Sequence, residues 1–268
     1  MPTPRNFEEL CSSARRSIIE MTHLAKSAHV GSSLSVVELL VAAYAHVQSV
    51  SPNSQVLLSK GHAAAALYAV LAEFEFIPKD LLKTYCENGS LLSGHASHNG
   101  IPGVPLSTGS LGHALPVAAG MALNNKLTKS VDQTVVVLSD GECDEGSNWE
   151  AALFASHHKL SNLKVLIDRN GLQSISTTES TLSLEPLADK WTSFGWDVRV
   201  SNGHEVEQLL SHLQSSSGGD LKPQVIIAST TKGKGVSFME GSNVWHYRSP
   251  DATDVLRALG ELETGGSK

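Results

Sequence analysis

Two polar segments with the composition of a cation-binding site each follow a run of apolar residues. Asp140, followed by a glycine, comes directly after the β-branched run 134–138, and Asn170, also followed by a glycine, comes soon after the apolar run 163–167. Such runs predict parallel strands that are buried on both faces. Because neighbouring strands lie about 4.8 Å apart, Asp140 and Asn170 are placed to reach one hard cation. The carboxyl edge of an open parallel sheet is also where ligands bind.

The two dipeptides taken alone also have an ordinary explanation, because Asp-Gly and Asn-Gly are common in turns. The longer string separates the two interpretations. Segment 139–151 reads Ser-Asp-Gly-Glu-Cys-Asp-Glu-Gly-Ser-Asn-Trp-Glu-Ala. Together with Asn170 it resembles the thiamine diphosphate motif, and in this full form it resembles the transketolase family.

The resemblance implies a metal ion and a cofactor. In transketolases the Asp carboxylate, the Asn side-chain oxygen and a main-chain oxygen two residues later hold Mg²⁺, which clamps the diphosphate of thiamine diphosphate. Here these positions are Asp140, Asn170 and Leu172. Ca²⁺ and Mn²⁺ are the expected substitutes for Mg²⁺. Ser139 stands where the family usually has Gly, which narrows the space beside the diphosphate.

Four histidines occupy positions that match the same family. His29, His95 and His246 stand where transketolases have histidines that contact the substrate, so the resemblance makes them the candidate catalytic residues. His62 begins a predicted helix and matches the histidine that contacts the diphosphate, and a helix N-terminus favours such an anion. A single histidine of this kind is more commonly an ordinary loop residue. Four histidines in the same order as the functional histidines of the family favour the functional interpretation.

The irregular segment 86–112 is rich in Gly, Ser, His and Pro, and long segments of this kind usually form functional loops. Its end resembles the family's Thr-Gly-x-Leu-Gly loop, whose backbone lies against the thiamine. Glu145 matches a family glutamate between paired cofactor sites, so we expect it at a subunit interface. His113 and Ala114 replace the family's Gln and Gly. Besides His62, the expected cofactor contacts are Gly109, Ser110, Leu111, Gly141, Glu142, Asn170 and His246.

Composition excludes several classes of protein. A net charge of −7 without a block of Lys and Arg argues against nucleic acid and anionic membrane partners. No apolar run approaches the length needed to span a membrane. Cys11, Cys86 and Cys143 are scattered without the spacing of a metal site. They are typical of reduced thiols in a cytoplasmic protein.

Helical and strand patterns alternate along the rest of the chain. This alternation predicts an α/β fold, a doubly wound parallel sheet flanked by helices, for residues 1–263, with a disordered tail at 264–268. Capping-box spacing predicts helix starts at Ser35 and Ser147. The serine- and glycine-rich run 215–219 is expected to be a surface connection. The remaining predicted elements are helices at 7–28, 39–47, 187–194 and 204–213, an alanine-rich helix ending near 76, and strands at 196–200 and 224–229.

The resemblance covers residues 7–259 and implies the N-terminal, thiamine diphosphate-binding subunit of a split transketolase. In such an enzyme the thiazolium carbanion adds to a ketose, and a two-carbon ketol unit passes to an aldose. The substrates would be sugars or sugar phosphates. The pyrimidine-binding domain of the family does not fit in this chain, so we expect a companion chain that carries it and two copies of each chain. The nearly all-apolar helix 39–47 belongs in a core or at a subunit interface, and we expect a second copy or the companion to cover it.

Two other functions remain open. The α-subunit of a 2-oxoacid dehydrogenase also binds thiamine diphosphate, but its relatives usually carry Asn-Asn where this chain has Arg169-Asn170, and they lack the histidine set. A regulatory or scaffold subunit that binds the cofactor without catalysis is the other alternative. The retained histidines and metal ligands disfavour it. The sequence does not identify the donor or the acceptor sugar.

Overall fold

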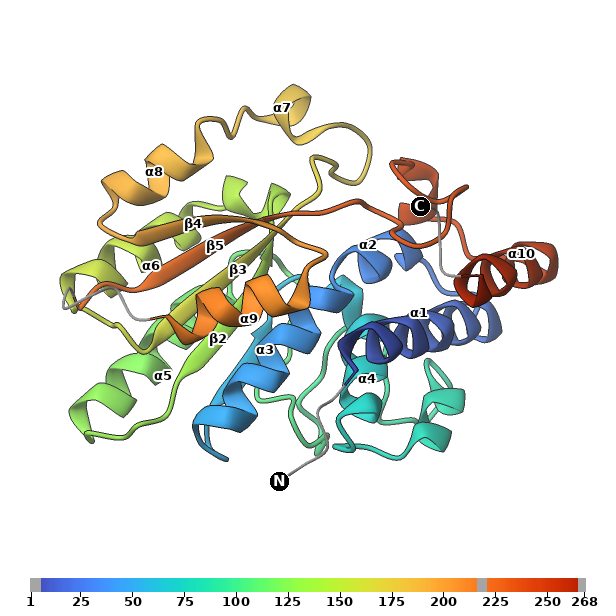
Figure 1. The fold of residues 1–268 in the computed structure, drawn as a ribbon, viewed down its shortest axis with the longest axis horizontal. Helices are drawn as coiled ribbons and strands as arrows, with labels where there is room; N and C mark the ends of the chain where they lie inside the picture. Colours follow the sequence, from blue (N-terminus) through green and yellow to red (C-terminus); the bar gives the residue numbers. More distant parts are fainter. Residues whose placement is uncertain (1–5, 216–220, 265–268) are drawn as a thin grey trace.

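The structure is a computed structural model that describes residues 6–215 and 221–264. Its centre is a parallel sheet of five strands in the order β1-β2-β3-β5-β4 (Figure 1). The polar ends of β2 and β3 lie side by side, since Ser139 is in register with Asp168. The predicted parallel sheet is therefore confirmed. The strands are β1 (Gln55–Leu58), β2 (Thr134–Ser139), β3 (Leu163–Arg169), β4 (Asp197–Asn202) and β5 (Gln224–Ser229).

Helices cover both faces of the sheet, as a doubly wound fold requires. One core joins a face of the sheet to α1, α2, α3, α4 and α9, and α10 packs on α1. A second core joins the other face to α5, α6 and α8. The helices are α1 (Phe7–Leu24), α2 (Val30–Ser35), α3 (Val37–Val50), α4 (Ala64–Glu73), α5 (Ala114–Leu127), α6 (Gly146–His157), α7 (Thr178–Thr181), α8 (Leu187–Ser193), α9 (Val206–Gln214) and α10 (Ala252–Glu263), with 3-10 turns η1 (Gly61–Ala63), η2 (Lys79–Thr84), η3 (Gly141–Asp144) and η4 (Asn243–His246).

The two cores explain why the central strands are apolar at almost every position. In β2, Val135 and Val137 belong to the first core, whereas Val136 and Leu138 belong to the second. Side chains alternate between the faces of a strand, so a strand covered on both sides needs apolar residues throughout. The near-continuous apolar run therefore predicted the strand correctly.

The apolar helix α3 is covered within this chain. Leu39, Leu40 and Val41 are completely buried, and α1, α4 and α9 pack around the helix. Of the two expectations for this helix, the core is confirmed. The expectation that a second copy or a companion must cover it is wrong, because these helices already do so.

The predicted helix starts at Ser35 and Ser147 are confirmed to within two residues, since α3 begins at Val37 and α6 at Gly146, but neither serine caps its helix. The Ser35 hydroxyl donates to the Asp168 carboxylate at 2.6 Å and lies 3.1 Å from the Ser32 carbonyl oxygen, and α3 begins after it without a side-chain cap. The Ser147 hydroxyl donates to the Gly112 carbonyl at 2.7 Å, and α6 also lacks a side-chain cap. Both hydroxyls make tertiary contacts that local spacing does not reveal.

Several boundaries and elements differ from the expectation. Helix α1 ends at Leu24 and α4 at Glu73, each earlier than expected. The four-residue strand β1, the short helix α2 and the terminal helix α10 were not predicted. The expected disordered tail and the expected connection 215–219 lie almost entirely outside the described residues.

Two findings bear on the environment of the chain. Within the described ranges, no helix is long and apolar enough to cross a membrane. All three cysteines are free, with Cys11 and Cys143 buried and Cys86 exposed.

A buried ion pair ties the carboxyl ends of the strands together. Lys60, just after β1, lies 2.5 Å from the carboxylate of Asp168 on β3, and the two side chains are 1% and 0% exposed. Asp168 also accepts hydrogen bonds from the hydroxyls of Ser35 and Thr230. The pair therefore joins β1, α2, β3 and the end of β5 at one point.

We predict that Asp168→Asn lowers the free energy of unfolding by about 3–5 kcal/mol, since it leaves the Lys60 ammonium buried without a counter-ion. Urea denaturation measures the change. The matched control is Asp80→Asn, which breaks the exposed Lys83–Asp80 pair and should leave stability nearly unchanged. Equal stability of the two variants would contradict a structural role for the buried pair.

Candidate functional site

A cavity of about 300 Å³ opens at the carboxyl edge of the sheet. It gathers residues from segments that are far apart in the chain, including the four histidines and the three candidate metal ligands. The cavity is lined by His29, Ser32, Lys60, His62, His95, Gly109, Leu111, Ser139, Asp140, Gly141, Asn170, Leu172, Gln173, Ser174, Lys232 and His246.

The four histidine rings form one cluster with His29 in its middle. Its ring centroid lies 5.2 Å from that of His62, 6.0 Å from that of His95 and 4.9 Å from that of His246. The backbone of His29 has a φ of 70°, and its N–H donates to the His246 carbonyl at 3.0 Å. A non-glycine residue rarely adopts this left-handed conformation, and such residues concentrate at functional sites.

The surroundings of His29, His62 and His246 keep these three imidazoles uncharged at neutral pH. Burial, together with the nearby His95 and Lys232, lowers the pKa of His29 to about 4. Burial and Lys232 lower the pKa of His246 to about 4 as well. The pKa of His62 lies well below its ordinary value because of burial and the neighbouring Lys60. A neutral imidazole offers one donor and one acceptor nitrogen, so each ring can hold a hydroxyl and exchange a proton with it.

Two buried lysines complete the cavity. The sequence assigned neither of them a role, although segment 232–235 resembles the family's Lys-Gly-x-Gly loop. Lys60 is 1% exposed and Lys232 is 2% exposed. Lys232 donates from Nζ to the Gln173 carbonyl at 3.1 Å. Burial and the nearby Lys60 lower the pKa of Lys232 to about 8. The available signal was a lysine followed by glycine soon after a buried strand, which occurs at both positions.

Asp140 and Asn170 line the same cavity together with Leu172, which agrees with the predicted placement at neighbouring strand ends. The Asp140 carboxylate accepts from the Gly171 N–H at 2.7 Å, from the Arg169 guanidinium at 3.1 Å and from the Gly141 N–H at 2.8 Å. Asn170 accepts from the Leu172 N–H at 3.1 Å through its side-chain oxygen. Burial and the neighbouring Asp168 raise the pKa of Asp140, so a bound cation would stabilise its charged form.

These donors fit a hard divalent cation. Among the described residues, no group of three or more His, Cys, Asp and Glu side chains is arranged to hold a metal ion. A site at Asp140 therefore depends on one carboxylate, one amide oxygen and one main-chain oxygen. Oxygen ligands of this kind, completed by phosphate oxygens, are what Mg²⁺ prefers.

Glu142 does not reach the cavity, which corrects its expected direct contact with the cofactor. It is completely buried and accepts from the Ser59 hydroxyl, from the Gly112 N–H at 2.8 Å and from the Ser139 N–H at 3.3 Å. These bonds occupy its carboxylate and tie the end of the 108–112 loop to two strand ends. Glu142 is thus part of the support of the cavity wall.

The 108–112 loop is held close to η1 on its other side. Thr108 donates from its hydroxyl to the Leu58 carbonyl at 2.7 Å. A Cβ on Gly61 would lie 2.3 Å from the Thr108 carbonyl oxygen, so only glycine permits this approach. Gly109 and Leu111 line the cavity, whereas the exposed Ser110 does not.

Of the three positions that depart from the family pattern, one lines the cavity and two do not. Ser139 lines the cavity, so its effect on the space beside a diphosphate is direct. His113 is exposed and Ala114 is buried, and neither lines the cavity. Glu145 is exposed just before α6, where a partner chain can contact it.

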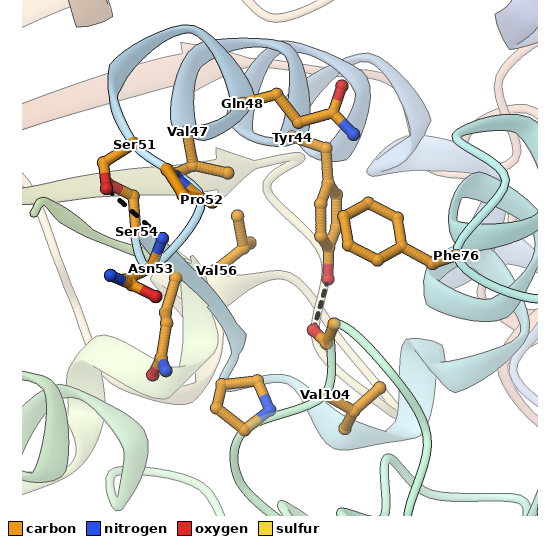
Figure 2. A pocket seen from close by; sticks show the side chains of 13 residues that line it. Tyr44, Val47, Gln48, Ser51, Pro52, Asn53, Ser54, Val56, Phe76 and Val104 are labelled. Carbon is orange, nitrogen blue, oxygen red and sulfur yellow. Dashed lines mark hydrogen bonds between the residues drawn. The ribbon is translucent and has the colours of Figure 1, made fainter.

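A larger cavity of about 670 Å³ lies at the opposite, amino edge of the sheet, beside Gln55 at the start of β1. Figure 2 shows the rings of Tyr44 and Phe76 side by side in its wall, with centroids 5.6 Å apart. Tyr44 donates from its hydroxyl to the Gly103 carbonyl at 2.9 Å. None of the described residues that line this cavity carries a charge, so it does not suit a diphosphate. The smaller cavity is the candidate site.

The fold and the site agree with the result of comparison with known proteins. The model of the family "Transketolase, thiamine diphosphate binding domain" matches residues 8–261. The chain therefore belongs to the transketolase N-terminal, thiamine diphosphate-binding family, as its sequence motifs indicated.

Within this family the chain is similar to proteins whose names mark them as separate subunits of a transketolase. It is 41% identical over 255 residues to one subunit of the apulose-4-phosphate transketolase of Phocaeicola vulgatus, covering 92% of this chain and 90% of that protein. It is 37% identical over 246 residues to the SqwG subunit of the 6-deoxy-6-sulfo-D-fructose transketolase of a Clostridium species, covering 89% of this chain and 90% of that protein.

Solved transketolases share the fold over a longer chain. The transketolase of Leishmania mexicana superposes with a TM-score of 0.85 at 26% identity, over 97% of this chain and 41% of that chain. For the Campylobacter jejuni enzyme the TM-score is 0.86 at 25% identity, over 96% and 42%. The chain thus spans about two fifths of the length of these solved enzymes.

We predict that protonation of His29 and His246 destabilises the fold. His29 and His246 have a pKa of about 4 against an ordinary 6.5, so the unfolded chain binds more protons between these values. The free energy of unfolding should therefore fall as the pH decreases from 6.5 towards 4. Denaturant unfolding as a function of pH measures this slope.

The matched control is the double variant His29→Gln, His246→Gln, which should show a shallower slope over the same pH window. NMR titration of the two imidazoles gives the decisive midpoints. Midpoints near 6.5 would contradict the proposed electrostatic environment.

Proposed function

We propose that this chain is the diphosphate- and metal-binding subunit of a two-chain transketolase that transfers a two-carbon ketol unit from a ketose to an aldose. The observation that carries the proposal is one cavity lined by four histidines, two lysines and an all-oxygen set of candidate metal donors. The relatives named as separate transketolase subunits, which this chain covers over at least nine tenths of their length, support the two-chain arrangement.

In this proposal one side of the cavity holds the diphosphate and its cation. Asp140, Asn170 and the Leu172 carbonyl would bind Mg²⁺, with Ca²⁺ or Mn²⁺ as substitutes. His62 and Lys232 would donate to the phosphate oxygens, helped by main-chain groups at Gly109, Leu111 and Gly141. Charge-assisted hydrogen bonds are stronger than neutral ones, and burial of the lysines strengthens them further.

The histidines would act on the sugar. Thiamine diphosphate, when bound, supplies the carbanion that attacks the ketose carbonyl. Because His29 and His246 are neutral, each can donate to one sugar oxygen and take up a proton from a hydroxyl as the carbon–carbon bond breaks. His95, in the loop at the cavity mouth, would contact the terminal hydroxyl of the donor sugar.

The remaining parts of the enzyme are assigned to partners. A companion chain would provide the pyrimidine-binding domain, and Glu145 would lie at the interface between paired sites. We expect two copies of each chain, in the cytoplasm, where the three free cysteines stay reduced. The names of the relatives point to ketoses such as apulose 4-phosphate or 6-deoxy-6-sulfofructose as the substrate class.

The metal assignment predicts the effect of Asp140→Ala. Loss of the charged ligand should remove the Mg²⁺-dependent part of cofactor binding and weaken affinity by more than about tenfold, or 1.4 kcal/mol. Calorimetric titration of thiamine diphosphate into the assembled enzyme, with Mg²⁺ or with a chelator, measures it. Asp80→Ala, at an exposed position outside the cavity, is the control. Unchanged affinity in Asp140→Ala would remove Asp140 from the metal site.

The two-chain proposal predicts that the isolated chain, given thiamine diphosphate and Mg²⁺, performs no ketol transfer and gains activity when its companion is added. The assay is transfer from a ketose phosphate to an aldose phosphate. Full turnover by the isolated chain would overturn the half-enzyme interpretation. Turnover of a 2-oxoacid with a lipoyl carrier would instead favour a dehydrogenase α-subunit, and an assembled complex that binds cofactor without any turnover would favour a regulatory subunit.

A further inference from the structure

A second group of polar side chains lies outside the candidate site, and none of its members lines the cavity. Arg15 on α1 donates to the carboxylate of Glu38 on α3 at 2.7 Å. His204, two residues before α9, places Nδ1 3.1 Å from the same carboxylate. Arg15 and Glu38 are each 6% exposed. These three residues are called the Glu38 cluster below.

The Glu38 cluster contacts both ends of one short turn. At its start, the Thr231 N–H donates to Nε2 of His204 at 2.8 Å. At its end, Nε of Arg15 donates to the Lys234 carbonyl at 3.0 Å. Between these two anchors lies Lys232, whose side chain lines the cavity. The turn that carries Lys232 is therefore held from behind at both ends by residues that share one carboxylate.

The hydrogen bonds fix the protonation state of His204. A main-chain N–H can only donate, so Nε2 of His204 must accept the bond from Thr231 and Nδ1 must carry the proton that points to Glu38. Burial alone would raise the pKa of Glu38, but Arg15 and His204 outweigh burial and hold it below its ordinary value. Glu38 is thus an anion that orients a neutral imidazole.

We propose that His204, oriented by Glu38 and Arg15, is a positioning residue that aims the Lys232 ammonium into the cavity at the diphosphate of the cofactor. The identity of that anion rests on the proposed function, whereas the placement of Lys232 does not. A purely structural role of the Glu38 cluster would affect stability alone. Positioning requires that loss of one particular bond, from Thr231 to Nε2, changes the behaviour of Lys232.

Two substitutions test the contacts of the two ring nitrogens of His204 separately. His204→Asn places an amide nitrogen near the position of Nδ1 and keeps the contact with Glu38, but it cannot reach Thr231. His204→Gln extends an amide oxygen to the position of Nε2 and keeps the acceptor for Thr231. Each variant loses one of the two bonds, so both are expected to be destabilised. His157→Asn, at an exposed position on α6, is the control for substitution of a histidine.

The first measurement is calorimetric binding of thiamine diphosphate with Mg²⁺ to the assembled enzyme. His204→Asn should weaken binding about tenfold, because the unpaired Thr231 N–H lets the turn move, while His204→Gln should stay close to wild type. The second measurement is the rate at which acetic anhydride modifies Lys232 in the isolated chain without cofactor, followed by mass spectrometry. The rate should rise about tenfold in His204→Asn, as the turn opens locally, and remain low in His204→Gln.

The two measurements separate this inference from the proposed function. Suppose that the wild-type enzyme fails to bind thiamine diphosphate, but the modification rate of Lys232 still differs between His204→Asn and His204→Gln. The proposed function is then wrong, and the positioning role of His204 is retained. If the assembled enzyme binds the cofactor and the two variants match each other in Lys232 reactivity and in affinity, the positioning role is overturned.

Discussion

The structure depends on the charge of Asp168. A carboxylate with no exposed surface is stable only when positive charge and hydrogen-bond donors surround it. Lys60, Ser35 and Thr230 meet that requirement from the end of β1, from α2 and from the end of β5. Since these segments must converge on one point, the residues next to them converge as well. That convergence brings His29, His62 and Lys232 to the rim of a single cavity.

The same convergence sets the electrostatics of the site. Buried lysines and a low local dielectric keep the imidazoles of His29 and His246 neutral, which suits contacts to sugar hydroxyls. The ammonium of Lys232 and the oxygen donors around Asp140 suit an anion and its cation. In the proposed function the charged groups bind the diphosphate and its cation, and the neutral imidazoles contact the sugar. The Glu38 cluster lies outside the cavity and contacts both ends of the turn that carries Lys232.

Much of the fold was predictable because two covered faces demand apolar residues at every position of a strand, and the runs ending before Asp140 and Asp168 show this directly. The meeting of Asp140 with Asn170 followed from strand spacing. What the sequence could not reveal was the partner of each polar group. Ser35 and Ser147 have the spacing of helix caps yet bond to distant segments. Lysine side chains usually lie in solvent, so the sequence did not predict the burial of Lys60 and Lys232. Their burial is evident only in the folded structure. Glu142 belongs to the motif but does not line the cavity, because its carboxylate is bonded to Ser59, Gly112 and Ser139.

In the proposed enzyme, this chain binds the diphosphate end of a cofactor whose other end lies in a companion chain. A crystal structure of the two chains with thiamine diphosphate and Mg²⁺ tests it most directly. We expect density for Mg²⁺ between Asp140, Asn170 and the Leu172 carbonyl, phosphate oxygens against His62 and Lys232, and an aminopyrimidine ring contacted by the companion. A diphosphate bound outside this cavity, or a cofactor enclosed by this chain alone, would contradict it.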